Sequence, residues 1–118
     1  MKNRGLLLPD QIDSTEAFAD FIGAQPLAAV YFSQPNCGIC EVLKPKLMEM
    51  FNERFPELVI AEVDCSRHRS LAAQQGVFAV PTLIVFFEGR EGIRKARAFG
   101  LGEVESELAR PYAVFTGD

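Results

Sequence analysis

The sequence predicts an α/β fold in which a central mixed, partly parallel sheet is covered by helices on both faces. Three uninterrupted apolar runs, at 27–32, 58–63 and 83–87, are typical of strands that are buried on both sides. Segments with helical spacing separate these runs, which is the pattern of parallel strands joined by crossover helices. A glycine-containing turn at 88–92 adds one antiparallel hairpin at the edge of the sheet. Because we find no internal repeat, low-complexity tract or linker, we expect residues 1–118 to form a single domain.

The first predicted strand covers residues 5–8, and a helix follows it. Asp13 is expected to cap this helix as part of a capping box with Glu16, three residues further along. The helix is predicted to end before Pro26, and the strand at 27–32 begins directly afterwards.

In the middle of the chain, large apolar residues recur every four positions, at Leu43, Leu47, Phe51 and Phe55. This spacing predicts an amphipathic helix of about four turns that begins near Cys37. The strand at 58–63 follows, and then a short helix at 70–75 that Gly76 closes.

The last third of the chain contains the predicted hairpin and a final helix. The strand at 83–87 is joined by the turn at 88–92 to a returning strand at 94–99. This returning strand suits a protected sheet edge because it carries three cations, Arg94, Lys95 and Arg97. A helix over 103–110 completes the order and is expected to stop at Pro111.

Composition and charge exclude several classes of function. The hydrophobic content of 48% is too high for a disordered chain. Twelve basic residues against sixteen acidic ones give a net charge of −4, so we expect no nucleic-acid partner. The uncharged stretches at 21–40 and 70–87 are interrupted by proline and glutamine, and neither predicts a membrane span. Since the apolar run at 6–8 is too short for a signal peptide, we expect a cytoplasmic protein with no membrane partner.

Two of the three cysteines stand three residues apart, in the sequence Cys37-Gly38-Ile39-Cys40. In a cytoplasmic chain such a pair is more often catalytic or metal-binding than structural. Residues at i and i+3 of a helix share a face, so the two thiols are predicted to lie within disulfide distance. The free amides and the dipole at a helix start stabilise negative charge. Cys37 is therefore predicted to be the nucleophilic thiolate and Cys40 the protonated thiol that resolves the intermediate.

Other interpretations of the cysteines stay open at this point. One is that the pair consists of two small core residues, because cysteine packs well among apolar neighbours. Another is a structural zinc site made by the pair together with Cys65 and His68. A chain of 118 residues can fold stably without a structural metal ion, and this argues against a zinc site. Cys65 by itself is either a half-buried apolar residue or a third thiol open to modification.

Between about residue 27 and residue 99 the sequence resembles the thioredoxin family. Four features carry this resemblance: the motif Asn36-Cys37-Gly38-Ile39-Cys40, Pro45 within the helix, Val80-Pro81-Thr82 before an apolar strand, and Gly89 and Gly100 after it. Pro81 follows Cys37 by 44 positions, which matches the spacing in the family.

The resemblance implies the thioredoxin fold and a thiol–disulfide oxidoreductase that acts on protein disulfides. It also implies a cis peptide bond before Pro81 that presents the backbone of Val80 to an extended substrate. The alternative is a trans proline at the start of an edge strand. Substrate contacts are expected at Gly38, Ile39, Cys65, Val80, Pro81, Gly100 and Leu101. No cofactor or metal is implied, and an external reductant such as a thioredoxin reductase-type enzyme or glutathione would restore the dithiol.

The sequence also departs from the thioredoxin pattern. Tyr31 replaces a buried aspartate that accepts a proton in the family, and Glu62 replaces a lysine on the next strand. We expect Glu62 to take over the proton transfer, with the hydroxyl of Tyr31 as its hydrogen-bond partner. The alternative is that Glu62 is a solvated carboxylate at a strand end. Asn36 stands in place of a tryptophan and Glu41 in place of a lysine, so we expect a less activated Cys37. These departures keep open a second class of function, a non-enzymatic adaptor that binds a partner through the same surface.

Overall fold

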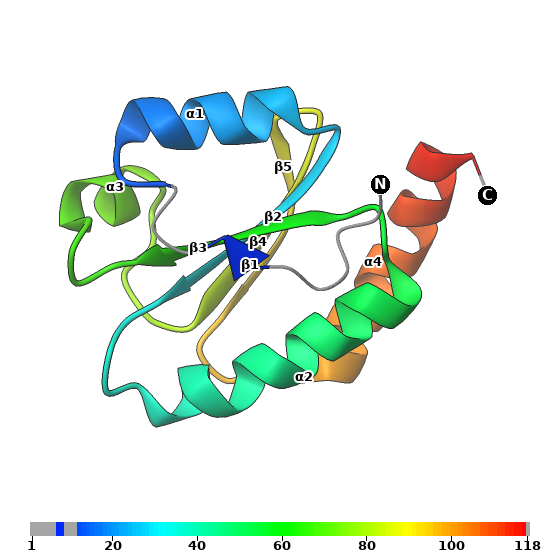
Figure 1. The fold of residues 1–118 in the computed structure, drawn as a ribbon. Helices are drawn as coiled ribbons and strands as arrows, with labels where there is room; N and C mark the ends of the chain where they lie inside the picture. The colour runs from blue at the N-terminus through cyan, green and yellow to red at the C-terminus, as the bar shows by residue number, and fades with distance from the viewer. Residues whose placement is uncertain (1–6, 9–11, 118) are drawn as a thin grey trace.

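Strands and helices follow one another in the predicted order (Figure 1). The computed structural model of the chain describes residues 7–8 and 12–117. The elements are β1 (Leu7–Leu8), α1 (Thr15–Ala24), β2 (Leu27–Ser33), α2 (Gly38–Arg54), β3 (Val59–Asp64), α3 (Arg69–Gln74), β4 (Thr82–Phe87), β5 (Arg90–Ala96) and α4 (Leu101–Thr116). Of the first predicted strand, residues 7–8 form β1, whereas 5–6 lie outside the described residues.

The sheet is mixed, as predicted, and has the order β1-β3-β2-β4-β5. Strand β3 pairs in parallel with both β1 and β2, whereas β4 runs antiparallel to its neighbours β2 and β5. In the central strand, Tyr31 lies opposite Glu62 of β3 on one side and Leu83 of β4 on the other. Every residue of β2 is buried, which explains its uninterrupted apolar sequence.

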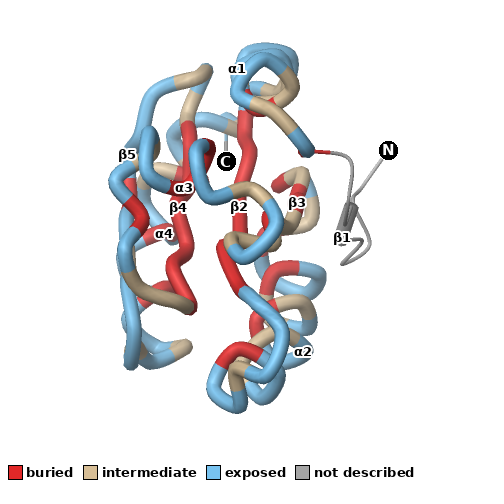
Figure 2. The backbone as a smooth tube through the Cα atoms, turned by 90° about the vertical axis from the view of Figure 1, so that its left-hand side faces the viewer, coloured by how far each residue is buried: buried red, intermediate tan, exposed pale blue. Residues whose placement is uncertain are grey.

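Helices cover both faces of the sheet, α1 and α3 on one and α2 and α4 on the other (Figure 1). Alternate residues of β2 point to opposite faces, because successive side chains of a strand do so. Tyr31 packs with Leu47 and Phe51 of α2, whereas Phe32 packs on the other face with Phe18 of α1. Figure 2 shows the resulting layering, with buried residues concentrated in the central strands and exposed residues along the outer sides of the helices. None of the described helices is both long enough and apolar enough to cross a membrane.

The first helix is capped one residue later than predicted. Ser14, not Asp13, is the N-cap, and its Oγ accepts a hydrogen bond from the backbone N–H of Ala17 at 3.0 Å. The serine hydroxyl satisfies one of the free amides of the first turn, and this replaces the expected capping box of Asp13 with Glu16.

The hairpin turn is shorter than the predicted 88–92. Glu88 and Gly89 form a two-residue turn with φ values of 52° and 81°, and β5 therefore begins at Arg90. Positive φ at both central residues is the geometry that matches the twist of hairpin strands. The pairing register shifts between Val85 and Phe86, which leaves Gly92 as the extra residue of a bulge. The strand also ends earlier than predicted, at Ala96 instead of residue 99.

The prediction that Pro111 stops the last helix was wrong. Helix α4 continues through Pro111 to Thr116 and ends at Gly117, whose φ of 82° is left-handed. Beyond the proline, Tyr112 is buried against Phe55, with ring centroids 4.9 Å apart, and its hydroxyl accepts a hydrogen bond from the backbone N–H of Glu57. These tertiary contacts outweigh the one backbone hydrogen bond that a proline removes.

Candidate active site

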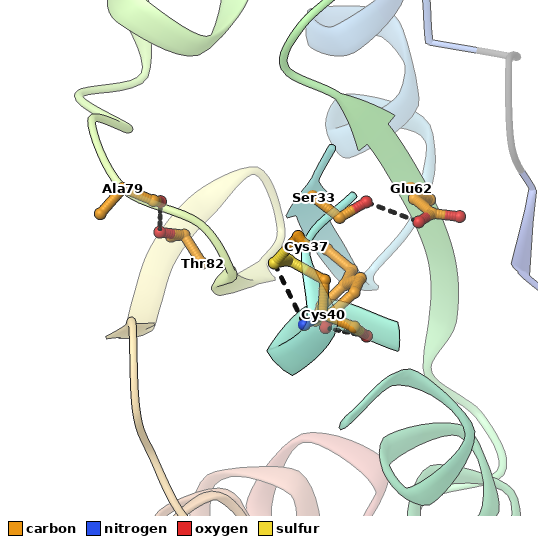
Figure 3. The surroundings of a disulfide bond; sticks show 7 residues. Ser33, Cys37, Cys40, Glu62, Ala79 and Thr82 are labelled. Atoms are coloured by element: carbon orange, nitrogen blue, oxygen red, sulfur yellow. Dashed lines mark hydrogen bonds between the residues drawn. A yellow bond between two sulfur atoms is a disulfide. The ribbon is translucent and has the colours of Figure 1, made fainter. Parts of the chain in front are cut away.

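Cys37 and Cys40 lie at the start of α2 and are joined by a disulfide (Figure 3). Asn36 adopts a left-handed conformation with φ of 62°, which turns the chain from β2 into the helix. Cys37 is the N-cap of α2, and the backbone N–H of Cys40 donates to its Sγ at 3.2 Å. Cys37 is half-buried, whereas Cys40 is only 3% exposed. The two sulfurs therefore differ in access, and Cys37 is the one that a partner can reach.

This placement favours a thiolate at Cys37 when the pair is reduced. Its Sγ receives a backbone N–H and stands at the positive end of the helix dipole. Negative charge at a helix start is stabilised, and this favours the thiolate form of a cysteine there. Glu41, in the first turn, is the one acidic residue of that turn and opposes this effect.

On the other side of the disulfide lies the segment before β4 (Figure 3). The peptide bond between Val80 and Pro81 is cis. The segment is held by two hydrogen bonds: Thr82 Oγ1 donates to the carbonyl of Ala79 at 2.7 Å, and the N–H of Arg97 donates to the carbonyl of Pro81 at 2.7 Å. Val80 has no backbone hydrogen bond to any described residue. Its N–H and C=O are therefore available to an extended chain.

Behind Cys40 a carboxylate, a hydroxyl and an amine meet. Glu62 of β3 accepts a hydrogen bond from Ser33 Oγ at 2.7 Å and pairs with Lys44 Nζ at 3.2 Å. Its side chain is 15% exposed, so Glu62 is not a solvated residue at a strand end. Together with Cys40 these three residues line a cavity of about 240 Å³. Figure 3 shows Ser33 and Glu62 on the opposite side of the disulfide from Ala79 and Thr82.

The expected hydrogen bond between Tyr31 and Glu62 is not formed. The hydroxyl of Tyr31 donates instead to the backbone carbonyl of Cys40 at 2.9 Å. Burial, and then the charge of Glu62, raises the pKa of Tyr31 to about 12, so the hydroxyl stays a neutral donor. Tyr31 therefore holds the first turn of α2 against the sheet, and the hydrogen-bond partners of Glu62 are Ser33 and Lys44 instead.

Sequence reasoning missed Ser33 and Lys44 as the partners of Glu62. Two signals were available in the sequence. Ser33 is a polar residue at the end of an apolar strand, and Lys44 follows Cys40 by one helical turn, which places both on the same face of α2.

Cys65 is a free, half-buried thiol directly after β3. Burial, and then the nearby charge of Asp64, raises its pKa to about 11, so it is a poor nucleophile at neutral pH. It lines a groove of about 560 Å³ between α3 and the segment before Pro81, together with Val80. Among the described residues, no three of the side chains that bind metals lie close enough to hold an ion.

The other predicted contact residues lie on the α2 side of the disulfide. Gly38, Ile39 and Gly100 line a second hollow, of about 640 Å³, between α2 and the start of α4. Leu101, the first residue of α4, is only partly exposed and packs against the core between α2, α4 and the sheet. Five of the predicted contacts line the two hollows, whereas Leu101 and the buried Pro81 line neither of them.

Comparison with known proteins agrees with this geometry. The sequence profile of the family described as Thioredoxin matches residues 11–109. The chain belongs to the thioredoxin family. Thioredoxin from Chlamydia trachomatis is 35% identical over 96 residues, covering 81% of this chain and 89% of its own. Thioredoxin-like protein YdfQ from Bacillus subtilis is 27% identical over 107 residues, covering 91% and 95%.

Solved thioredoxin structures share the fold. A mutant thioredoxin from Halobacterium salinarum superposes with a TM-score of 0.79 at 21% identity, covering 95% of both chains. Thioredoxin from Fasciola hepatica superposes with a TM-score of 0.73 at 25% identity, covering 86% of this chain and 96% of its own. The expected thioredoxin-like fold is confirmed. Membership of the thioredoxin family and the Cys37–Cys40 pair together support a thiol–disulfide oxidoreductase in the general sense.

Proposed function

We propose that this thioredoxin-family chain reduces disulfide bonds of other proteins with Cys37 as the attacking sulfur and Cys40 as the resolving one. The position of Cys37 is the observation that carries the proposal. Its sulfur caps a helix, accepts a backbone N–H and is reachable, while its partner sulfur is buried one turn behind it. A thiolate that is both stabilised and accessible is what disulfide exchange requires.

The reaction proceeds in two exchanges. The Cys37 thiolate attacks one sulfur of the substrate disulfide, forms a mixed disulfide and releases the other substrate sulfur as a thiolate, which takes up a proton. Cys40 then loses its proton and attacks the Cys37 sulfur, which releases the second substrate thiol and forms the Cys37–Cys40 disulfide. Two electrons pass from the dithiol to the substrate. An external dithiol or thiol reductant, a thioredoxin reductase-type enzyme or glutathione, returns them.

Glu62 is proposed to accept the proton of Cys40. The carboxylate and Cys40 line the same cavity, whose volume of about 240 Å³ exceeds the roughly 30 Å³ that one water molecule occupies. Water in this cavity would link the thiol to the carboxylate. Ser33 and Lys44 hold the two carboxylate oxygens in place. Tyr31 is proposed to act only through position, because its hydroxyl is engaged with the Cys40 carbonyl.

The substrate chain is proposed to pair with the free backbone groups of Val80 beside Pro81 and to cross the disulfide between the two hollows. An exposed N–H and C=O pair accepts an extended chain in the manner of an added strand. The proposed contacts within the two hollows are Gly38, Ile39, Cys65, Val80 and Gly100. Pro81 and Leu101 line neither hollow and are proposed as contacts between the two. The proposed compartment is the cytoplasm, where this dithiol would be kept reduced.

Reduction of insulin by dithiothreitol tests the proposal. Wild-type protein is expected to accelerate precipitation of the insulin chains, and Cys37→Ser is expected to abolish the acceleration. Cys40→Ser is expected to accumulate a mixed disulfide with insulin that a non-reducing gel separates, because the resolving thiol is missing. Wild-type activity no greater than that of Cys37→Ser would refute the oxidoreductase and favour the adaptor.

A further inference from the structure

Large apolar side chains are exposed around the disulfide. Among the described residues five large hydrophobic side chains are exposed, and three of them line the two hollows beside Cys37: Ile39 is 57% exposed, Val42 is 60% and Phe78 is 84%. Apolar side chains gathered at one place on a surface indicate an interaction site, whereas single ones do not.

The groove between α3 and the segment before Pro81 has a distinct chemistry. Phe78 forms its most exposed apolar part, and Arg69 of α3 is its one charged lining residue. No carboxylate among the described residues pairs with Arg69. The groove therefore offers an apolar surface beside a cation with which no described carboxylate pairs.

The hollow on the other side of the disulfide repeats this chemistry. Ile39 and Val42 supply its exposed apolar surface, and Lys46 is its one charged lining residue. Lys46 too has no ion-pair partner among residues 7–8 and 12–117. A chain that crosses Cys37 thus meets a cation on each side and no anion in either hollow, although the whole protein carries a net charge of −4.

We propose that the preferred substrates are protein segments in which an acidic residue and a large apolar residue flank the disulfide-bonded cysteine. The acidic side chain pairs with Arg69, and the apolar side chain covers Phe78. This inference rests on the proposed oxidoreductase function and narrows its substrate class. Opposite charges across an interface give specificity and set the register of a bound chain. A buried aromatic anchor supplies much of the binding energy.

Disulfide-linked peptides test the inference. Three peptides share one sequence around the cysteine and differ at one flanking position, which is aspartate, asparagine or lysine. Hydroxyethyl disulfide, small and uncharged, reports the reactivity of the dithiol alone. At low salt we expect kcat/KM to be about five-fold higher for the aspartate peptide than for the lysine peptide, since exposed ion pairs are individually weak. The difference should shrink at about 0.5 M salt, where exposed charges are screened.

Three variants test which residues cause the substrate preference. Arg69→Glu is expected to reverse the preference, so that the lysine peptide becomes the better substrate when each rate is divided by the rate on hydroxyethyl disulfide. Arg110→Glu makes the same charge change at an exposed position of α4, which covers the other face of the sheet from α3, and should keep the wild-type preference. Phe78→Ser should lower kcat/KM about five-fold for a peptide with a flanking leucine and leave a peptide with a flanking serine unaffected.

Three results would overturn the inference, and they can be told apart. Equal rates for the three peptides with normal reduction of hydroxyethyl disulfide would refute the acidic substrate class alone. An unchanged preference in Arg69→Glu would refute the pairing of the acidic side chain with Arg69. Failure of the wild-type protein to reduce any peptide or hydroxyethyl disulfide would refute the oxidoreductase, and the inference with it.

Discussion

Replacing Gly92 by alanine is expected to destabilise the protein by about 1–3 kcal/mol, the usual cost of overpacking. Gly92 is the extra residue of the bulge in β5. A Cβ atom at this position would lie 2.5 Å from two ring carbons of Phe87. Carbon atoms in contact are normally about 3.5–4.0 Å apart, so the ring must move by roughly 1 Å. The Phe87 ring packs against Phe115, with centroids 5.5 Å apart, and moving it loses part of that contact.

The effect can be measured by urea and thermal unfolding of the oxidised protein. We expect the urea midpoint to fall without a change in slope, and the melting temperature to fall by about 3–10 °C. Gly102→Ala is the matched control, because a Cβ at Gly102 in α4 meets no atom within 4 Å. The same chemical change is expected to stabilise the protein there by up to about 1 kcal/mol, since alanine favours helices more than glycine does.

A double mutant decides whether the Phe87 ring is the cause. In a Phe87→Leu background the ring carbons are gone, so Gly92→Ala should cost less than it does in the wild-type background. An equal cost in both backgrounds would show that the bulge itself, and not the ring, rejects a side chain, and the steric argument would be wrong.

Three further predictions concern the site and the first helix. Glu62→Gln is expected to slow formation of the internal disulfide and to alter its pH profile, because no carboxylate is left to accept the Cys40 proton. Tyr31→Phe should keep the wild-type profile; quenched alkylation measures both, and an unchanged profile in Glu62→Gln would refute the proton transfer. In reduced protein, iodoacetamide should label Cys65 slowly at neutral pH and faster as the pH approaches the thiol pKa of about 11, as mass spectrometry can measure. Rapid labelling at neutral pH would contradict the burial of this thiol. Ser14→Ala should destabilise the fold by about 1 kcal/mol in urea unfolding, and Asp13→Ala by much less; the reverse order would restore Asp13 as the cap.

Most of the architecture could be predicted because its signal is local. Residues 27–32 form an uninterrupted apolar run, which predicts a buried strand. Large apolar residues, Leu47 and Phe51 among them, recur at every fourth position, which predicts a buried helix face. The Cys37–Cys40 pair could also be predicted from a short stretch of sequence, because its spacing and its place at a helix start depend only on neighbouring residues.

The errors came from contacts between distant parts of the chain. A proline normally ends a helix, but the packing of Tyr112 on Phe55 carries α4 past Pro111, and this packing joins two helices far apart in sequence. The partner of Glu62 was misjudged in the same way. The pairing of β2 with β3 puts Tyr31 directly opposite Glu62, yet the tyrosine hydroxyl reaches the carbonyl of Cys40 instead. Register alone therefore does not determine which side chains meet.

Because the attacking sulfur is also the cap of α2, the choice of inactive variant affects what a binding experiment measures. Serine at position 37 leaves an oxygen that can receive the same amide, so the helix start keeps its acceptor while the nucleophile is lost. Alanine removes both, and missing caps cost about 0.5–2 kcal/mol. Complexes trapped or titrated with a serine variant thus report on the surface that meets the partner, whereas an alanine variant adds fraying of the very turn that the partner must touch.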